Sequence, residues 1–233
     1  MGKVGSSSVY QALKNVMPGA DIHHVHFLSD KWLNEKLPAM HSLFHKNISA
    51  GNNIRKYIRL NPQKKIMIIT LVREPIIREI SNLFENWKVN YSDINKIPMD
   101  VLWKEISNDT FEFPLNWFDD DFKEYLGFDI YNTPFQMEKG FQIYCNGNFK
   151  ILCIKLEKLN DVCSEAFQEF MRVNIHLSRE NQSEKKKGSE QYLIMKNTFK
   201  MSKEKLTQIY GSKFVKHFYS EKEIEKLFNK WVE

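Results

Sequence analysis

The chain has 233 residues, 42% of them hydrophobic and 13% aromatic, which is enough for one globular domain with a substantial core. Its net charge of +5 suits an anionic small molecule or an acidic glycan, and is too small and dispersed to indicate a nucleic-acid-binding protein. No apolar run approaches the length of a membrane span and no signal peptide precedes Gly2, so we expect a cytoplasmic protein without a transmembrane segment.

A short Gly/Ser turn opens the chain and leads into a helical pattern over residues 7–16. The first turn of a helix offers backbone N–H groups and a positive dipole end to an anion. Gly5 would let the backbone approach that anion closely, and Lys3 would supply a mobile positive charge. Three hydroxyl groups follow, on Ser6, Ser7 and Ser8. The turn therefore predicts a site for a phosphate or sulfate group, with an ordinary Ser-rich helix cap as the alternative.

Residues 22–28 alternate well enough to predict a short strand that carries three histidines. In a strand, His24 and His26 would share one face and His23 would point to the other. Histidine can act as a general base near neutral pH, whereas a His-x-His pair alone supplies too few ligands for a metal ion. The alternative is that these are structural histidines.

A helix is expected over residues 29–48, kinked or broken at Pro38, and another over residues 53–60. The apolar run from Lys65 to Val72 predicts a strand that is buried on both faces, as in a parallel sheet. It ends at Arg73-Glu74-Pro75, where a helix is expected over residues 75–88. A guanidinium and a hydroxyl near such a helix start can bind a phosphate monoester, and Arg73 and Ser81 are placed to do so.

The rest of the chain continues to alternate between helical and strand patterns. Asn146-Gly147 predicts a hairpin between strands at 141–145 and 149–156, of which the second would be central. Helices are expected around 100–106, 117–126, 163–173, 191–200, 203–210 and 221–231, the last opened by a capping box at Ser220 and Glu223. This alternation predicts an α/β fold with three layers, α/β/α, around a mainly parallel central sheet.

Three other groups of residues carry side chains that could form a chemical site. Cys145, Cys153 and Cys163 have no metal-ligand spacing, so we expect free, buried thiols in a reducing compartment. The run Asp119-Asp120-Asp121 predicts a surface rather than a metal site, because no second acidic cluster pairs with it. The run Lys185-Lys186-Lys187 is either a solvated loop or a basic loop over an anion.

Two segments resemble the nucleotide motifs of sulfotransferases that use 3′-phosphoadenosine 5′-phosphosulfate (PAPS). The order Gly-Lys-x-Gly-Ser-Ser-Ser is similar to their 5′-phosphosulfate loop, and Arg73-Glu74-Pro75-x-x-Arg78-x-x-Ser81 to their 3′-phosphate motif, with Glu74 in place of the usual Asp. The resemblance implies that Lys3, Gly5, Ser6, Ser7 and Ser8 hold the phosphosulfate, and that Arg73 and Ser81 hold the 3′-phosphate. His24-x-His26 resembles an element of uronyl 2-O-sulfotransferases, which makes His26 the expected base and His24 its partner; Glu35 and Glu85 are alternatives.

Residues 3–10, 24–29 and 213–220 resemble a family of capsular polysaccharide synthesis proteins, a branch of the sulfotransferase-like fold. The resemblance implies a single P-loop-like domain over residues 1–233. Such a loop normally follows a strand, so three alternatives stay open: the first strand was truncated, the start codon was assigned wrongly, or the sequence is a fragment. It implies transfer of a sulfuryl group from PAPS to a glycan hydroxyl, with nucleotide donor and glycan acceptor as partners and no metal ion.

Two alternative functions stay open. A P-loop-like kinase is disfavoured because the pattern G-x-x-x-x-G-K-[ST] is not met, since Lys3 precedes Gly5. The other alternative is a non-catalytic relative that binds a nucleotide or a glycan. The acceptor itself is set by variable loops and is not predicted.

Overall fold

The computed structural model describes residues 1–177 and 188–233, and these form two compact units. The first unit takes Met1–Val72 and the described part of Trp117–Arg179. The second takes Arg73–Asn116 and the described part of Glu180–Glu233. The assignment of residues 1–233 to a single domain stays a prediction.

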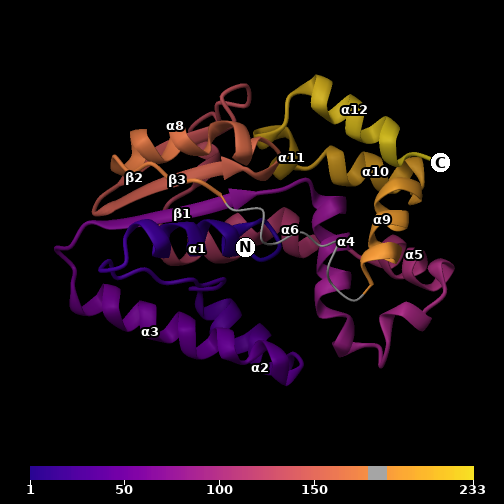
Figure 1. The fold of residues 1–233 in the computed structure, drawn as a ribbon, viewed down its shortest axis with the longest axis horizontal. Coiled ribbons are helices and arrows are strands. Elements are labelled where there is room, and N and C mark those ends of the chain that lie inside the picture. The colour runs from indigo at the N-terminus through magenta and orange to yellow at the C-terminus, as the bar shows by residue number, and fades with distance from the viewer. Residues whose placement is uncertain (178–187) are drawn as a thin grey trace. The chain divides into compact units, whose positions relative to one another are not determined.

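The first unit contains a three-stranded sheet in the order β1-β3-β2 (Figure 1). Its strands are β1 (Ile66–Val72), β2 (Phe141–Asn146) and β3 (Phe149–Lys155). β1 runs parallel to β3, and β2 pairs with β3 as an antiparallel hairpin. The hairpin turns at Gly147, whose φ of 58° suits a residue without a side chain. The expected strand after Lys65, the hairpin and the central position of its second strand are therefore confirmed. Burial of the first strand on both faces is not, because β1 lies at the edge of the sheet, Met67 is 45% exposed and only its last three residues are buried.

The α/β class is confirmed, but the expected sheet is not. In the described residues the sheet is small and mixed, since one of its two strand pairings is parallel and the other antiparallel. A P-loop-like three-layer arrangement around a mainly parallel sheet is thus not confirmed. The hairpin explains part of the difference, because a tight turn joins only antiparallel strands.

The expected strand over residues 22–28 is wrong, because this segment lies in no helix or strand. Its backbone groups bond to side chains instead. The Asp121 carboxylate accepts hydrogen bonds from the N–H groups of Leu28 at 2.8 Å and Ser29 at 2.9 Å. The Trp117 indole donates to the carbonyl of His26 at 3.3 Å. Backbone groups satisfied in this way are not available for a strand ladder.

The described residues of the first unit form five α-helices: α1 (Ser6–Val16), α2 (Leu37–Ala39), α3 (Lys46–Leu60), α7 (Glu124–Leu126) and α8 (Leu159–Met171). Two π-helical turns, Lys31–Lys36 and Phe118–Lys123, lead into α2 and α7. α8 packs against β2 and β3 (Figure 1). The expected break near Pro38 is confirmed, since the chain becomes extended at Met40.

The second unit is built from helices in its described residues. They are α4 (Pro75–Asn86), α5 (Met99–Asn108), α9 (Ser189–Thr198), α10 (Lys203–Tyr210), α11 (Lys213–Phe218) and α12 (Glu221–Trp231). α6 (Glu112–Trp117) ends where the chain passes to the first unit. α4 packs against α5 and α9, and α10 against α11 and α12. The predicted capping box between Ser220 and Glu223 is confirmed at the start of α12.

Two surface predictions need correction. Cys153 and Cys163 are buried as expected, but Cys145 is exposed because it points outward from the edge strand β2. Asp121 was expected on the surface but is only 2% exposed, because it holds the backbone of Leu28 and Ser29. Over the described residues, no helix combines the length and apolar character that crossing a membrane requires.

Candidate functional site

The loop that begins the chain is held in a defined conformation. Met1 and Val4 are buried, which anchors the loop on both sides of Lys3. Gly5 precedes α1 with a φ of 83°, and an added Cβ there would lie 2.5 Å from a methyl group of Leu156. Lys3 itself has a φ of 66°, a conformation that costs a non-glycine residue about 1–3 kcal/mol. Such backbone strain is typical of functional loops, so this geometry supports the prediction made for Lys3 and Gly5.

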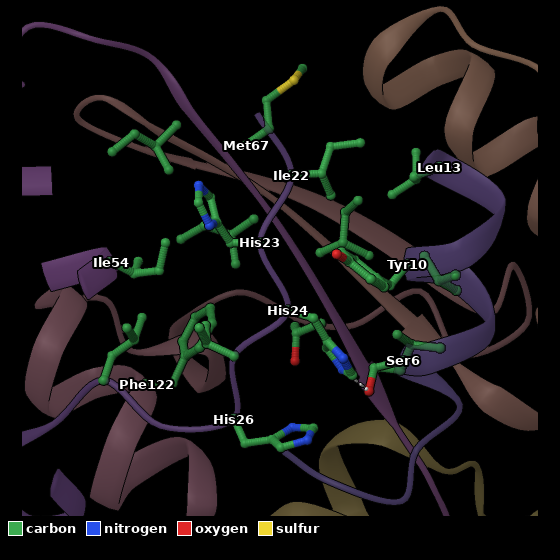
Figure 2. A pocket seen from close by; sticks show the side chains of 18 of the residues that line it. Ser6, Tyr10, Leu13, Ile22, His23, His24, His26, Ile54, Met67 and Phe122 are labelled. Atoms are coloured by element: carbon green, nitrogen blue, oxygen red, sulfur yellow. Dashed lines mark hydrogen bonds between the residues drawn. The ribbon is translucent and has the colours of Figure 1, made fainter. Parts of the chain in front are cut away.

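The start of α1 contacts the histidine segment. The Ser6 hydroxyl lies 2.9 Å from Nε2 of His24, and the ring of Tyr10 stacks on that imidazole at 5.4 Å between centroids. Ser6 and Tyr10 are four residues apart and therefore share a face of the helix. Figure 2 shows His24 directed toward these two side chains. The structure thus brings together Ser6 of the loop and His24, two residues that were predicted separately.

His24 and His26 lie side by side even though no strand holds them. Their rings meet edge to face at 4.8 Å. His23 points away from them, as expected: it pairs with Asp21 at 2.6 Å, and Figure 2 shows it on the side of Ile54. The predicted pairing of His24 with His26 is therefore confirmed, although its expected cause, a strand, is wrong.

Both imidazoles are held in the neutral form. Burial lowers the pKa of His26 to about 3, helped by the positive charges of Lys3 and Lys46. Burial also lowers the pKa of His24. The Nδ1 atom of His26 is buried and has no hydrogen-bond partner within the described residues. The unpaired nitrogen leaves a free position for a proton, but a group with a pKa of about 3 is a weak base until a nearby anion raises that pKa.

A pocket of about 400 Å³ lies beside these histidines (Figure 2). Its walls are mostly apolar and come from α1, α3, β1 and the segment that carries the histidines. All positions from Lys65 to Leu71 line it. Because alternate residues of a strand face opposite sides, lining by consecutive residues means that the pocket follows the edge of β1 and not one face of the sheet.

In the second unit, Arg73 and Ser81 also meet as predicted. The Arg73 guanidinium donates a hydrogen bond of 2.9 Å to the Ser81 hydroxyl. The Tyr192 hydroxyl, on α9, lies 3.3 Å from the same oxygen. Burial alone would raise the pKa of Tyr192, but hydrogen bonding to Ser81 and the charge of Arg73 lower it below its usual value. Sequence reasoning missed Tyr192, since no local signal links it to a residue 111 positions earlier.

The two other polar residues of this motif have structural roles. The Glu74 carboxylate caps α4 by accepting from the N–H groups of Ile76 and Ile77, and it also accepts from the Tyr210 hydroxyl at 2.6 Å. A carboxylate thus already occupies the N-terminus of α4, so an anion there would meet Arg73 and Ser81 instead. Arg78 is buried, pairs with Glu79 and stacks on the ring of Phe113.

Replacing Glu74 by alanine is expected to lower the melting temperature by about 5–10 °C. The variant loses a helix cap, worth about 1 kcal/mol. It also leaves the buried Tyr210 hydroxyl without its acceptor, which costs about 1–3 kcal/mol more. Each kcal/mol shifts the melting temperature by roughly 2–4 °C in a chain of this size. Circular dichroism should show the loss in Glu74→Ala, little change in Glu74→Asp, and none in the exposed Glu85→Ala; equal melting of all three would refute the capping role.

The remaining candidates lie apart from these clusters or outside the description. Glu35 and Glu85, the alternative bases, are exposed. The run Lys185-Lys186-Lys187 lies outside the described residues. Within residues 1–177 and 188–233, no three His, Cys, Asp or Glu side chains gather where they could hold a metal ion.

Comparison with known proteins places the chain in a family. The family model described as "Putative capsular polysaccharide synthesis protein" matches residues 86–220, which is more than half of the chain. The chain belongs to this family. No curated protein and no solved structure matched the chain.

The matched range shows which part of the chain is similar to this capsular polysaccharide synthesis family. It includes the β2–β3 hairpin, α8 and Tyr192. It excludes the Lys3 loop, the His24 and His26 pair, Arg73 and Ser81. Membership therefore supports a role in polysaccharide synthesis and leaves the chemistry to be argued from the two clusters.

Proposed function

We propose that this protein is a sulfotransferase that moves a sulfuryl group from PAPS to a hydroxyl group of a glycan. The observation that carries the proposal is the contact between Arg73 and Ser81. These residues are eight positions apart, and their side chains meet at 2.9 Å, which supports their expected role as ligands of one phosphate group. Arginine donates several N–H bonds in a fixed fork that matches a phosphate, and a hydroxyl adds another donor.

The Lys3 loop is proposed to hold the phosphosulfate end of the donor. Its support is the left-handed backbone at Lys3 and Gly5, together with the start of α1, which has no side-chain cap at Gly5. Ser6, Ser7 and Ser8 form the first turn of that helix, where N–H groups and hydroxyls can bind anionic oxygens. Burial is the main cause of the depressed pKa of His26, and the positive charges of Lys3 and Lys46 add to it; an anion at the loop would offset these charges.

In the proposed reaction, the oxygen of the acceptor hydroxyl attacks the sulfur atom of PAPS. The bond from sulfur to the bridging oxygen breaks, and its electron pair leaves on the phosphate of 3′-phosphoadenosine 5′-phosphate. Lys3 stabilises the charge that grows on that oxygen. His26 takes the acceptor proton, and His24 positions His26 through their ring contact.

The acceptor is proposed to be a glycan because the family is one of polysaccharide synthesis. The pocket beside the histidines is a poor place for a whole sugar, since most of its lining is apolar. Several of its polar groups are also paired with one another, as in Ser6 with His24 and His23 with Asp21. We therefore assign only the reacting hydroxyl to the vicinity of His26.

Calorimetry with the desulfated product, 3′-phosphoadenosine 5′-phosphate, tests the proposal first. The wild-type protein should bind it more tightly than it binds AMP or ATP. Arg73→Ala should lose about 10²-fold in affinity for the 3′-phosphorylated nucleotide and less than about threefold for AMP, because a charged partner of a phosphate is worth roughly 2–5 kcal/mol. The exposed Arg59→Ala variant is the matched control and should bind as wild type.

Three other results would decide against the proposal. Preference for ATP with Mg²⁺ would favour a kinase. Binding of a glycan without any nucleotide would favour a non-catalytic relative. If Arg73→Ala lowered the affinity for AMP and for the 3′-phosphorylated nucleotide equally, Arg73 would not be a ligand of the 3′-phosphate.

A further inference from the structure

Helix α9 adds a third polar side chain, that of Tyr192, to the pair formed by Arg73 and Ser81. The Tyr192 side chain is only 8% exposed, and its hydroxyl lies 3.3 Å from the Ser81 oxygen. Its ring packs edge to face on Phe84, one helical turn beyond Ser81 on α4, at 5.6 Å. Tyr192 is thus fixed by the same helix that carries Ser81, and its hydroxyl is directed at the predicted phosphate ligands.

Positive charge also gathers around Tyr192. Lys196 lies one turn further along α9, and its charge acts on both Tyr192 and Lys230 of α12. Burial lowers the pKa of Lys230, and Lys196 lowers it further, while the charge of Glu74 opposes both. Glu74 already accepts hydrogen bonds from two backbone N–H groups and Tyr210. The cluster therefore holds three cations and one carboxylate that is engaged elsewhere.

We propose that Tyr192 and Lys196 complete the anion site of Arg73 and Ser81 and give it selectivity for a phosphate monoester. This inference rests on the proposed function, and it names the side chains that recognise the 3′-phosphate. Neither residue belongs to the motif that led to Arg73 and Ser81, and both lie within the part of the chain that the family model matches.

The chemistry of a phosphate monoester fits this set of groups. Near neutral pH the monoester carries close to two negative charges and offers three terminal oxygens as acceptors. Arg73, Ser81 and Tyr192 supply N–H and O–H donors, and Lys196 supplies further charge. Because the three donors already contact one another, they are held close together before the anion arrives, which lowers the entropy cost of binding.

The test compares two nucleotides that differ only at the 3′ position. Calorimetry would measure AMP and 3′-phosphoadenosine 5′-phosphate on the full chain. Tyr192→Phe should lose about 10- to 100-fold in affinity for the 3′-phosphorylated nucleotide, as for a hydrogen bond to a charged group, and less than about twofold for AMP. Lys196→Ala should lose about three- to tenfold, and the loss should shrink as salt is raised.

Matched variants separate recognition from general damage. Tyr91→Phe removes a phenol that also donates to a partner, Glu105, in the same unit, and Lys203→Ala removes an exposed lysine from α10. Both should bind like the wild type, and thermal melting should show that Tyr192→Phe is folded.

The outcomes distinguish this inference from the proposed function. If the wild-type protein does not prefer the 3′-phosphorylated nucleotide, both fall. If it does, but Tyr192→Phe and Lys196→Ala keep the wild-type preference, only the present inference falls. An equal loss of affinity for both nucleotides in Tyr192→Phe would also overturn the present inference, because Tyr192 would then act only on the structure of the site.

Discussion

Replacing His26 by asparagine is expected to lower the turnover number of sulfuryl transfer by about 10²- to 10⁴-fold, the usual contribution of a general base. Affinity for 3′-phosphoadenosine 5′-phosphate should change by less than about threefold, because the role assigned to His26 is toward the acceptor proton. Asparagine keeps a polar side chain of similar reach but cannot take up the proton. The measurement is a single-turnover assay of sulfuryl transfer beside calorimetry of the product nucleotide. His23→Asn is the matched control, since His23 faces Asp21 and should retain activity.

The pH dependence gives this prediction a second readout. In the free protein the pKa of His26 is about 3, below the value of an unfolded histidine, so the neutral base is present throughout the physiological range. An anionic donor would offset the charges of Lys3 and Lys46 and raise that pKa. The acid limb of kcat, which reports the donor complex, should therefore lie at higher pH than the acid limb of kcat/KM, and both limbs should vanish in His26→Asn.

The same shift has a consequence for stability. The unfolded chain takes up a proton at His26 near pH 6.5, whereas the folded chain does so only near pH 3. The stability that neutral His26 contributes is thus complete above pH 6.5 and is lost as pH falls toward 3, at up to about 1.4 kcal/mol per pH unit. His26→Asn should lose less stability over this range than the wild type does. A wild-type acid limb in the variant's activity would exclude the role of His26 as the base. An unchanged acid melting profile would show instead that folding does not lower the pKa of His26.

The sequence predicted those features that depend on residues close to one another in the chain. The turn at Asn146-Gly147 is set by two residues, and the capping box needs only Ser220 and the residue three positions on. Arg73 lies two residues before α4 and Ser81 about two turns into it, so the start of one helix brings them close. In each case the interacting groups are near in sequence, so a local sequence pattern was enough to predict their contact.

Long-range contacts decided the features that the sequence did not predict. An alternating pattern over residues 22–28 fits an extended segment as well as a paired strand, and pairing depends on what lies beside it. Here Asp121 and Trp117, more than 90 residues away, take up the backbone groups of that segment. Tyr192 was missed for the same reason, because no residue near it in the sequence predicts its contact with Ser81.

The Lys3 loop depends both on a local sequence pattern and on a long-range contact. Gly5 and the serines of α1 were identified from spacing, and the left-handed backbone at Gly5 agrees with a role that only glycine can fill easily. The contact from Ser6 to His24 could not be predicted, because it depends on how an irregular segment returns to α1. Together they place a cation, a helix start and a neutral imidazole in one unit, and the proposed sulfuryl transfer would use all three.

Replacing Lys3 by alanine is expected to lower the turnover number by about 10²- to 10³-fold, as for loss of one group that stabilises charge in the transition state. Alanine has a cost similar to that of lysine at a φ of 66°, so the substitution removes the charge without relieving the backbone. Affinity for 3′-phosphoadenosine 5′-phosphate should fall by less than about tenfold, since that product lacks the sulfuryl group. Lys3→Arg should keep part of the activity, and Lys14→Ala, at the other end of α1, should keep all of it.

The charge of Lys3 can also be followed without turnover. Lys3 is one of the positive charges that lower the pKa of His26, so Lys3→Ala should raise that pKa above about 3. Nuclear magnetic resonance of the imidazole Cε1–H signals would record the titration, with His23 as an internal reference. A raised pKa together with lost turnover would place Lys3 and His26 in one electrostatic site. An unchanged pKa would mean that the ammonium group is held away from the histidine, and the joint role proposed for the two residues would then fail.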